Sequence, residues 1–155
     1  MSRLSDCFKR LKADDRKAVI PYIVAGDPSL TTTVPLMHRM VGAGADIIEI
    51  GGPFSDPMSE GPVIQLGHER ALVNGVRLRD VLEMIREFRE RDSQTPVVVM
   101  GYANPIERMG HVAAADALAE VGVDGLITVD IPPEEVQLLN AELQRVGIDN
   151  IFLIS

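Results

Sequence analysis

A single cysteine, the lack of any long apolar run and a shortage of basic residues limit what this chain can do. Cys7 is the only cysteine in 155 residues, so an intramolecular disulfide is impossible, which fits a reducing compartment. No apolar run approaches the roughly 20 residues of a membrane helix, and the N-terminus lacks the apolar core of a signal peptide. The net charge of −8 argues against nonspecific binding to nucleic acid or to an anionic membrane. We therefore expect a soluble, cytoplasmic protein.

Several common catalytic and binding motifs are also missing. The sequence contains neither G-x-G-x-x-G nor G-x-x-x-x-G-K-[ST], the glycine-rich fingerprints of phosphate binding. The three histidines have no metal-ligand spacing, and Cys7 fits the apolar face of a helix, so we expect no metal site. Ser55 and Ser59 do not lie in a nucleophile elbow, which argues against a serine hydrolase.

The residues that are present predict one α/β domain. Hydrophobic residues make up 46% of the chain and charged residues 25%, which is enough for a sizeable core. A first amphipathic helix is predicted over residues 2–12. Apolar strands are predicted over residues 18–25, 46–51, 97–100, 126–129 and 151–154. Helices are predicted between them, ending near residues 42, 73, 91, 120 and 147, the last one opened by residues 131–135. This alternation predicts a parallel sheet with right-handed crossovers.

The stretch over residues 46–62 holds the two most interesting carboxylates. Glu49 lies inside an apolar strand, on the same face as Ile47, and Glu60 lies on the turn-rich loop that follows. Ligand sites of parallel α/β folds lie at the carboxyl ends of the strands. Desolvation should raise the pKa of Glu49, which suits a proton shuttle near neutral pH. The alternative is a structural glutamate. Glu60 is expected to be solvated unless it faces Glu49.

Other polar and aromatic residues at the strand ends are open to two interpretations. Tyr22 and Tyr102 either line a planar apolar pocket or are ordinary core aromatics. Asp27 and Asp130 are interpreted as local caps or loop hydrogen bonds. His68, on the helix after the acidic loop, is the histidine nearest to these groups in sequence.

The motifs at the strand ends resemble the tryptophan synthase alpha subunit family. The stretches that carry the resemblance are residues 21–28, 48–57, 60–65, 100–106 and 129–135. The resemblance covers the whole chain and implies a (β/α)8 barrel. It implies a lyase of tryptophan biosynthesis that cleaves indole-3-glycerol phosphate to indole and glyceraldehyde 3-phosphate by a retro-aldol step. It further implies an α2β2 assembly with a beta subunit, which holds pyridoxal phosphate, whereas the alpha subunit needs no cofactor.

The resemblance also assigns roles to individual residues. Glu49 matches the glutamate that protonates the indole ring carbon and helps to deprotonate the glycerol side chain. Glu60 stands where the family has an aspartate that polarises the indole N–H. The loop over residues 53–60, from Pro53 through Asp56, matches the segment that meets the beta subunit.

The resemblance places a further set of residues in the apolar indole pocket. The positions are Tyr22, Met100, Tyr102, Ile127, Val129 and Leu153. The spacings 100/102, 127/129 and 151/153 are i, i+2 pairs, so each pair should face one way in a strand. Besides Glu60, two further positions differ from the family: Gly52 replaces Val or Ile, and Ser59 replaces a small apolar residue.

The length predicts only part of a barrel. A complete (β/α)8 barrel needs about 250 residues, so residues 1–155 are expected to form a single incomplete barrel domain, truncated after the fifth strand. The phosphate-binding loops that follow strands seven and eight would then lie outside this sequence. Two alternatives to the lyase are a non-catalytic fragment or beta-subunit-binding module, and an unrelated open α/β binding protein.

Overall fold

A curved sheet of five parallel strands forms the centre of the computed structural model, which describes residues 2–153. The strands are β1 Tyr22–Val24, β2 Ile48–Gly51, β3 Val97–Gly101, β4 Gly125–Thr128 and β5 Asp149–Ile151. They lie in sequential order, β1-β2-β3-β4-β5. This is the order of a (β/α) barrel, because a doubly wound sheet reverses its strand order partway across.

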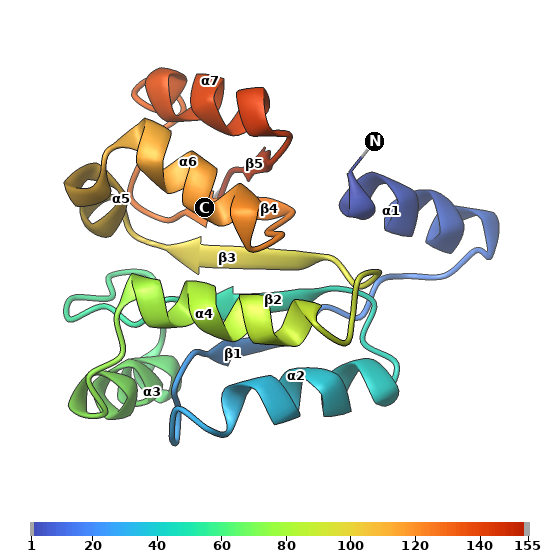
Figure 1. Ribbon diagram of the computed structural model, residues 1–155, viewed down its shortest axis with the longest axis horizontal. Coiled ribbons are helices and arrows are strands. Elements are labelled where there is room, and N and C mark those ends of the chain that lie inside the picture. The colour runs from blue at the N-terminus through green and yellow to red at the C-terminus, as the bar shows by residue number, and fades with distance from the viewer. Residues whose placement is uncertain (1, 154–155) are drawn as a thin grey trace.

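Helices cover the outer face of the sheet and both of its ends (Figure 1). The helices are α1 Arg3–Ala13, α2 Thr33–Gly42, α3 Pro62–Val73, α4 Leu78–Arg89, α5 Ala103–Met109, α6 His111–Glu120 and α7 Gln137–Val146. Helices α2, α4, α6 and α7 bury apolar side chains against the outward residues of the strands, such as Ile48, Ile50 and Val99. Figure 1 shows α3 and α5 at the end toward which β3 points, with α1 at the opposite end. None of the helices in the described part of the chain is long and apolar enough to cross a membrane.

Helix α1 covers the inner face near the N-terminal ends of the strands. Its apolar side, Leu4, Cys7 and Leu11, packs against Ile47 and Val98. Cys7 is therefore a packed thiol, as the helical spacing predicts, and burial raises its pKa. Ile47 and Glu49 share this inner face, which confirms the period-2 prediction for the second strand.

Two predicted strands differ from the observed ones by more than two residues at one end. The first is limited to β1 because Pro21 has no N–H for the ladder, and Val19 and Ile20 are exposed. The fifth begins at Asp149, opposite Gly125, and its ladder ends at Ile151. Phe152 and Leu153 follow the last ladder pair, and Leu153 is 52% exposed; residues 154 and 155 lie outside the described part. The limits and register of β5 are therefore set by its pairing with β4, and not by the position of the apolar run.

Two predicted helices also differ. Gly110 adopts φ 86°, a left-handed conformation that divides the third crossover into α5 and α6. Residues 131–135 do not open the last helix, because α7 starts at Gln137 after a turn. The helices predicted to end near residues 73 and 91 are confirmed as α3 and α4.

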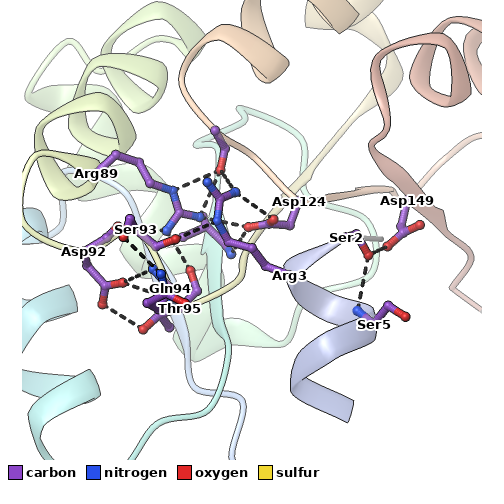
Figure 2. A network of polar contacts seen from close by, with 12 residues as sticks. Ser2, Arg3, Ser5, Arg89, Asp92, Ser93, Gln94, Thr95, Asp124 and Asp149 are labelled. Carbon is purple, nitrogen blue, oxygen red and sulfur yellow. Dashed lines mark hydrogen bonds and ion pairs between the residues drawn. The ribbon is translucent and has the colours of Figure 1, made fainter. Parts of the chain in front are cut away.

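A buried ion-pair network joins α1 and α4 to the N-terminal ends of β3 and β4 (Figure 2). The Asp124 carboxylate, 4% exposed, accepts hydrogen bonds from Arg3 at 2.9 Å and from Arg89 at 2.8 Å. It also accepts the Val97 N–H at 2.9 Å. Burial lowers the pKa of Arg89, and Asp124 opposes this change. Arg89 also donates to the carbonyl oxygens of Gly122, Asp92 and Thr95. Each of the three charged side chains, Arg3, Arg89 and Asp124, therefore has an oppositely charged partner.

Candidate functional site

Glu49 occupies the inner face of β2, in register with Tyr22 on β1 and Val98 on β3. The residue is half-buried, and desolvation raises the pKa of its carboxyl group, as the apolar strand predicts. In residues 2–153 no hydrogen bond to this carboxylate is found. A carboxyl group with a raised pKa and no fixed partner can exchange a proton with a ligand.

Tyr22 reaches the carboxyl end of the sheet by crossing over Gly51. Any Cβ atom at position 51 would collide with the Tyr22 hydroxyl, so only glycine permits this path. Burial and the charges of Glu60 and Glu49 raise the pKa of Tyr22, so the phenol stays protonated. The Tyr22 phenol therefore lies close enough to both carboxylates of the candidate site for their charges to affect its pKa.

Glu60 is buried, contrary to the expectation of a solvated loop carboxylate. Its side chain is 4% exposed, and the Tyr102 hydroxyl donates a short hydrogen bond to Oε2. His68 Nε2 lies 3.9 Å from Oε1. The loop folds back over the strand ends and brings this carboxylate to the phenols of Tyr22 and Tyr102.

Tyr102 follows β3 directly and holds the acidic loop at two points. Its hydroxyl accepts the Met58 N–H at 3.1 Å while donating to Glu60. Its ring stacks on Phe54 with the centroids 4.4 Å apart. Burial and the hydrogen bond to Glu60 raise the pKa of Tyr102. The loop between Phe54 and Glu60 is therefore fastened to the end of β3.

His68 is the site residue to which the sequence alone gave no role. It is 1% exposed, its Nδ1 accepts the Phe54 N–H at 2.9 Å, and its Nε2 lies 3.2 Å from the Tyr22 hydroxyl. Desolvation lowers the pKa of His68, an effect that Glu60 opposes. A signal was present: His68 lies four residues after Ile64 and three before Ala71, which puts it on the inward stripe of the predicted helix.

The six residues aligned with the indole pocket divide into two groups. The first group, Tyr22, Met100 and Ile127, lies within the strands: Tyr22 is in register with Glu49, and Met100 is in register with Ile127. Tyr102, Val129 and Leu153 lie beyond the last residues of their strands. Strand alternation therefore does not fix the direction of these three side chains, and for them the i, i+2 argument stays a prediction.

A small apolar cavity of about 40 Å³ lies next to Tyr102. Its walls include Phe54, Val99 and Leu126, together with residues of α4, α5 and α6. Val99 and Leu126 belong to the outer core, so the cavity lies between the sheet and its helices. It is far smaller than the roughly 300–1,000 Å³ of small-molecule pockets, and it is distinct from the predicted indole site on the inner face.

The predicted partner-binding loop combines anchored and exposed positions. Pro53 is half-buried and lines the cavity, whereas Asp56 is exposed and accepts the Ser55 hydroxyl at 2.6 Å. Met58 is 75% exposed. Gly52 donates its N–H to the Met100 carbonyl at 2.8 Å, which continues the ladder beyond Gly51.

The remaining strand-end aspartates have structural partners, although these partners are distant in sequence and not the local ones that the sequence predicts. Asp27 forms a bidentate pair with Arg70 of α3, at 2.6 and 2.8 Å. Asp130 accepts the Ala103 N–H at 2.7 Å at the start of α5. Among the side chains of residues 2–153, no cluster of three or more His, Cys, Asp or Glu could hold a metal ion.

Comparisons with known proteins give one consistent result. The family model for the tryptophan synthase alpha chain matches residues 8–155. The tryptophan synthase alpha chain of Thioalkalivibrio sulfidiphilus is 59% identical over the whole chain, which spans 58% of that protein. The alpha chain of Nitrosococcus oceani is 56% identical, with 57% of its length covered.

Solved structures agree with the sequence relatives. Tryptophan synthase subunit alpha of Legionella pneumophila superimposes with a TM-score of 0.97 at 49% identity, over 99% of this chain and 59% of that one. The tryptophan synthase complex of Pyrococcus furiosus matches with a TM-score of 0.84 at 39% identity, over 88% of this chain and 56% of that one. The chain thus spans less than two thirds of these relatives, which are (β/α)8 barrels. It belongs to the tryptophan synthase alpha chain family.

Proposed function

We propose that this chain provides the acid–base groups for retro-aldol cleavage of indole-3-glycerol phosphate. The observation that carries the proposal is the position of Glu49 and Glu60 around the Tyr22 phenol, at the carboxyl ends of the strands. Active sites of (β/α)8 enzymes lie at this face. The family supports the reaction class, a carbon–carbon lyase of tryptophan biosynthesis.

Glu49 is the proton-transfer group of the proposed reaction. Its carboxylic acid donates a proton to C3 of the indole ring, and the resulting carboxylate takes the proton of the hydroxyl on the adjacent side-chain carbon. The bond between C3 and that carbon then breaks, its electron pair returns to the ring, and the hydroxyl carbon becomes the aldehyde of glyceraldehyde 3-phosphate. Glu49 ends protonated, as it began. The raised pKa of Glu49 supports this cycle because desolvation makes the protonated carboxylic acid easier to form than in a solvent-exposed glutamate.

Glu60 is the orienting carboxylate of the proposed reaction. By accepting the indole N–H it would increase the electron density of the ring and favour protonation at C3. Glutamate is one methylene longer than the family aspartate, and a displacement of about 1 Å can change a rate by about 100-fold. The Tyr102 hydroxyl holds this longer side chain at the strand ends.

The inner-face residues of three strands supply an apolar surface for an indole ring. Met100, Ile127 and Ile151 form one row across β3, β4 and β5. We include Tyr22, Tyr102, Val129 and Leu153 in the same proposed pocket on the basis of the family alignment. No resident cofactor is proposed, since pyridoxal phosphate would belong to the beta subunit.

The test is release of indole from indole-3-glycerol phosphate, measured with and without a bacterial tryptophan synthase beta chain. The Glu49→Gln variant is the control, because it keeps the shape of the side chain and removes the proton. General acid–base groups contribute about 100- to 10,000-fold, so we expect a loss of at least about 100-fold. Equal rates of indole release by the unchanged chain and by the Glu49→Gln variant would refute the role of Glu49.

A second function, binding of a beta chain without turnover, is favoured by the loop that carries Pro53 and Asp56. Asp56 and Met58 are exposed, whereas the loop is anchored at Phe54 and Glu60. Because the loop is anchored at both ends, its exposed side chains are held in a fixed arrangement that a partner chain could bind. A pull-down with a beta chain tests this function, and a folded chain that fails to bind would exclude it.

A further inference from the structure

The hydrogen bonds of His68 fix its protonation state. The Phe54 N–H points at Nδ1 at 2.9 Å, so Nδ1 must offer a lone pair. A neutral imidazole carries one N–H, which must therefore be on Nε2. That N–H faces the Tyr22 hydroxyl at 3.2 Å and Glu60 Oε1 at 3.9 Å. His68 thus donates toward the candidate site and accepts from the acidic loop.

Two side chains from different elements hold the acidic loop through its backbone. His68 of α3 accepts the Phe54 N–H, and Tyr102 accepts the Met58 N–H at 3.1 Å. Phe54 also stacks on the Tyr102 ring. Glu60 lies at the far end of the same loop, bonded to Tyr102. The position of Glu60 therefore depends on both anchors.

Helix α3 does not need His68 to stay in place. Arg70 forms its bidentate pair with Asp27, and Asn74 Nδ2 donates to the carbonyl oxygens of Gly26 and Pro28 at 3.1 and 2.8 Å. Ile64 and Ala71 pack into the outer core. Substitution of His68 should therefore disturb the loop before it disturbs the helix.

We infer that His68 is a positioning residue for Glu60, which it places by holding the Phe54 N–H with Nδ1 and by directing its Nε2–H at Tyr22 and Glu60. The catalytic meaning of this role rests on the proposed function, because Glu60 orients the indole ring there. The hydrogen bonds themselves can be tested without turnover.

The first measurement is the ¹⁵N NMR spectrum of the imidazole side chains in the intact 155-residue chain at neutral pH. We expect the His68 signals of a neutral ring with a bare Nδ1 and a protonated Nε2. An Nδ1–H tautomer or a doubly protonated ring would overturn the inference, since neither can accept the Phe54 N–H.

The second measurement uses substitutions of His68 that keep one hydrogen-bonding position of the imidazole ring or neither of them. Asparagine places an oxygen near the position of Nδ1, glutamine places an amide nitrogen near that of Nε2, and phenylalanine keeps the volume without either bond. We expect His68→Phe to speed amide exchange at Phe54 by at least about tenfold and to move the side-chain carboxyl signal of Glu60. His68→Asn should restore the slow exchange, and His68→Gln should restore the Glu60 signal.

The matched control is His111→Asn, a histidine change on α6 that should alter neither signal. Unchanged Phe54 exchange and Glu60 signal in His68→Phe would overturn the inference. In an indole-release assay, His68→Phe should lower kcat by about 10- to 100-fold with KM changed less than twofold. A chain that releases no indole would count against the proposed function alone, because the NMR result decides the role of His68 independently.

Discussion

The two polar networks at opposite ends of the sheet differ in how completely their charges are satisfied. At the N-terminal end, Asp124 meets two guanidinium groups and a backbone N–H (Figure 2). At the C-terminal end, Glu60 accepts one phenol and Glu49 has no hydrogen bond within residues 2–153. The first arrangement holds elements together, whereas the second leaves acceptor capacity for a ligand.

The two ends also differ in the groups that surround the carboxylates. Two guanidinium groups, those of Arg3 and Arg89, form ion pairs with Asp124. Neutral phenols and a neutral imidazole surround Glu60. Desolvation raises the pKa of Glu49 at this same end, so the C-terminal end is the one prepared for proton chemistry.

The largest expected effect breaks the N-terminal network. Asp124→Asn should lower the free energy of unfolding by about 3–5 kcal/mol, because it leaves the buried Arg89 without its counter-charge. Urea denaturation measures the change. Asp116→Asn, which removes an exposed partner of Arg145, is the matched control and should cost at most about 1 kcal/mol. Similar losses for both would show that the buried pair has no special role.

The opposite sign is expected at the C-terminal end. Glu49→Gln should raise the free energy of unfolding at pH 7 by about 0.5–2 kcal/mol, the usual range when a functional but unfavourable group is removed. The raised pKa means that the folded chain binds the proton more tightly, so ionisation of Glu49 destabilises the fold above its ordinary pKa near 4.3. The gain should disappear below that pH. A lower free energy of unfolding for Glu49→Gln at pH 7 would contradict the view that the Glu49 carboxylate lacks a stabilising partner.

His68 should make the C-terminal end sensitive to acid. Its pKa is lowered in the folded chain, so the unfolded chain takes up the proton first as the pH falls below about 6.5. Stability is full above that value and decreases below it, by at most about 1.4 kcal/mol per pH unit for one proton. Urea midpoints from pH 7.5 to 5 measure this slope, which His68→Asn should reduce. An equal slope in the variant would assign the acid sensitivity to other groups.

The smallest effect concerns the glycine pair at the end of β2. Gly52→Ala should stabilise the chain by about 0.4–1 kcal/mol, because the nearest atom to a new Cβ is the Met100 carbonyl oxygen at 3.8 Å. Gly51→Ala should destabilise it, since the Tyr22 hydroxyl occupies that space. Thermal unfolding of the two variants gives the comparison. A stabilising Gly51→Ala would show that Tyr22 moves aside easily.

Much of the fold followed from pattern alone, and the exceptions have definite causes. The parallel order, the inward face of Glu49 and the packing of Cys7 are local consequences of strand and helix periods. The limits of β5 depend on Gly125 of a neighbouring strand, which no local pattern contains.

The site was predictable only in part for the same reason. The raised pKa of Glu49 follows from its apolar strand. The burial of Glu60 and the role of His68 arise from a loop folding back onto α3 and β3, so they are tertiary effects. Neither residue's immediate neighbours in sequence reveal them.

The passage of Tyr22 over Gly51 constrains how this family member can evolve. Any larger residue at position 51 collides with the phenol, so a mutation there is tolerated only after residue 22 has become smaller. The same change at residue 22 removes the hydroxyl that His68 contacts. We therefore expect the effect of a substitution at any one of these three positions to depend on the residues at the other two.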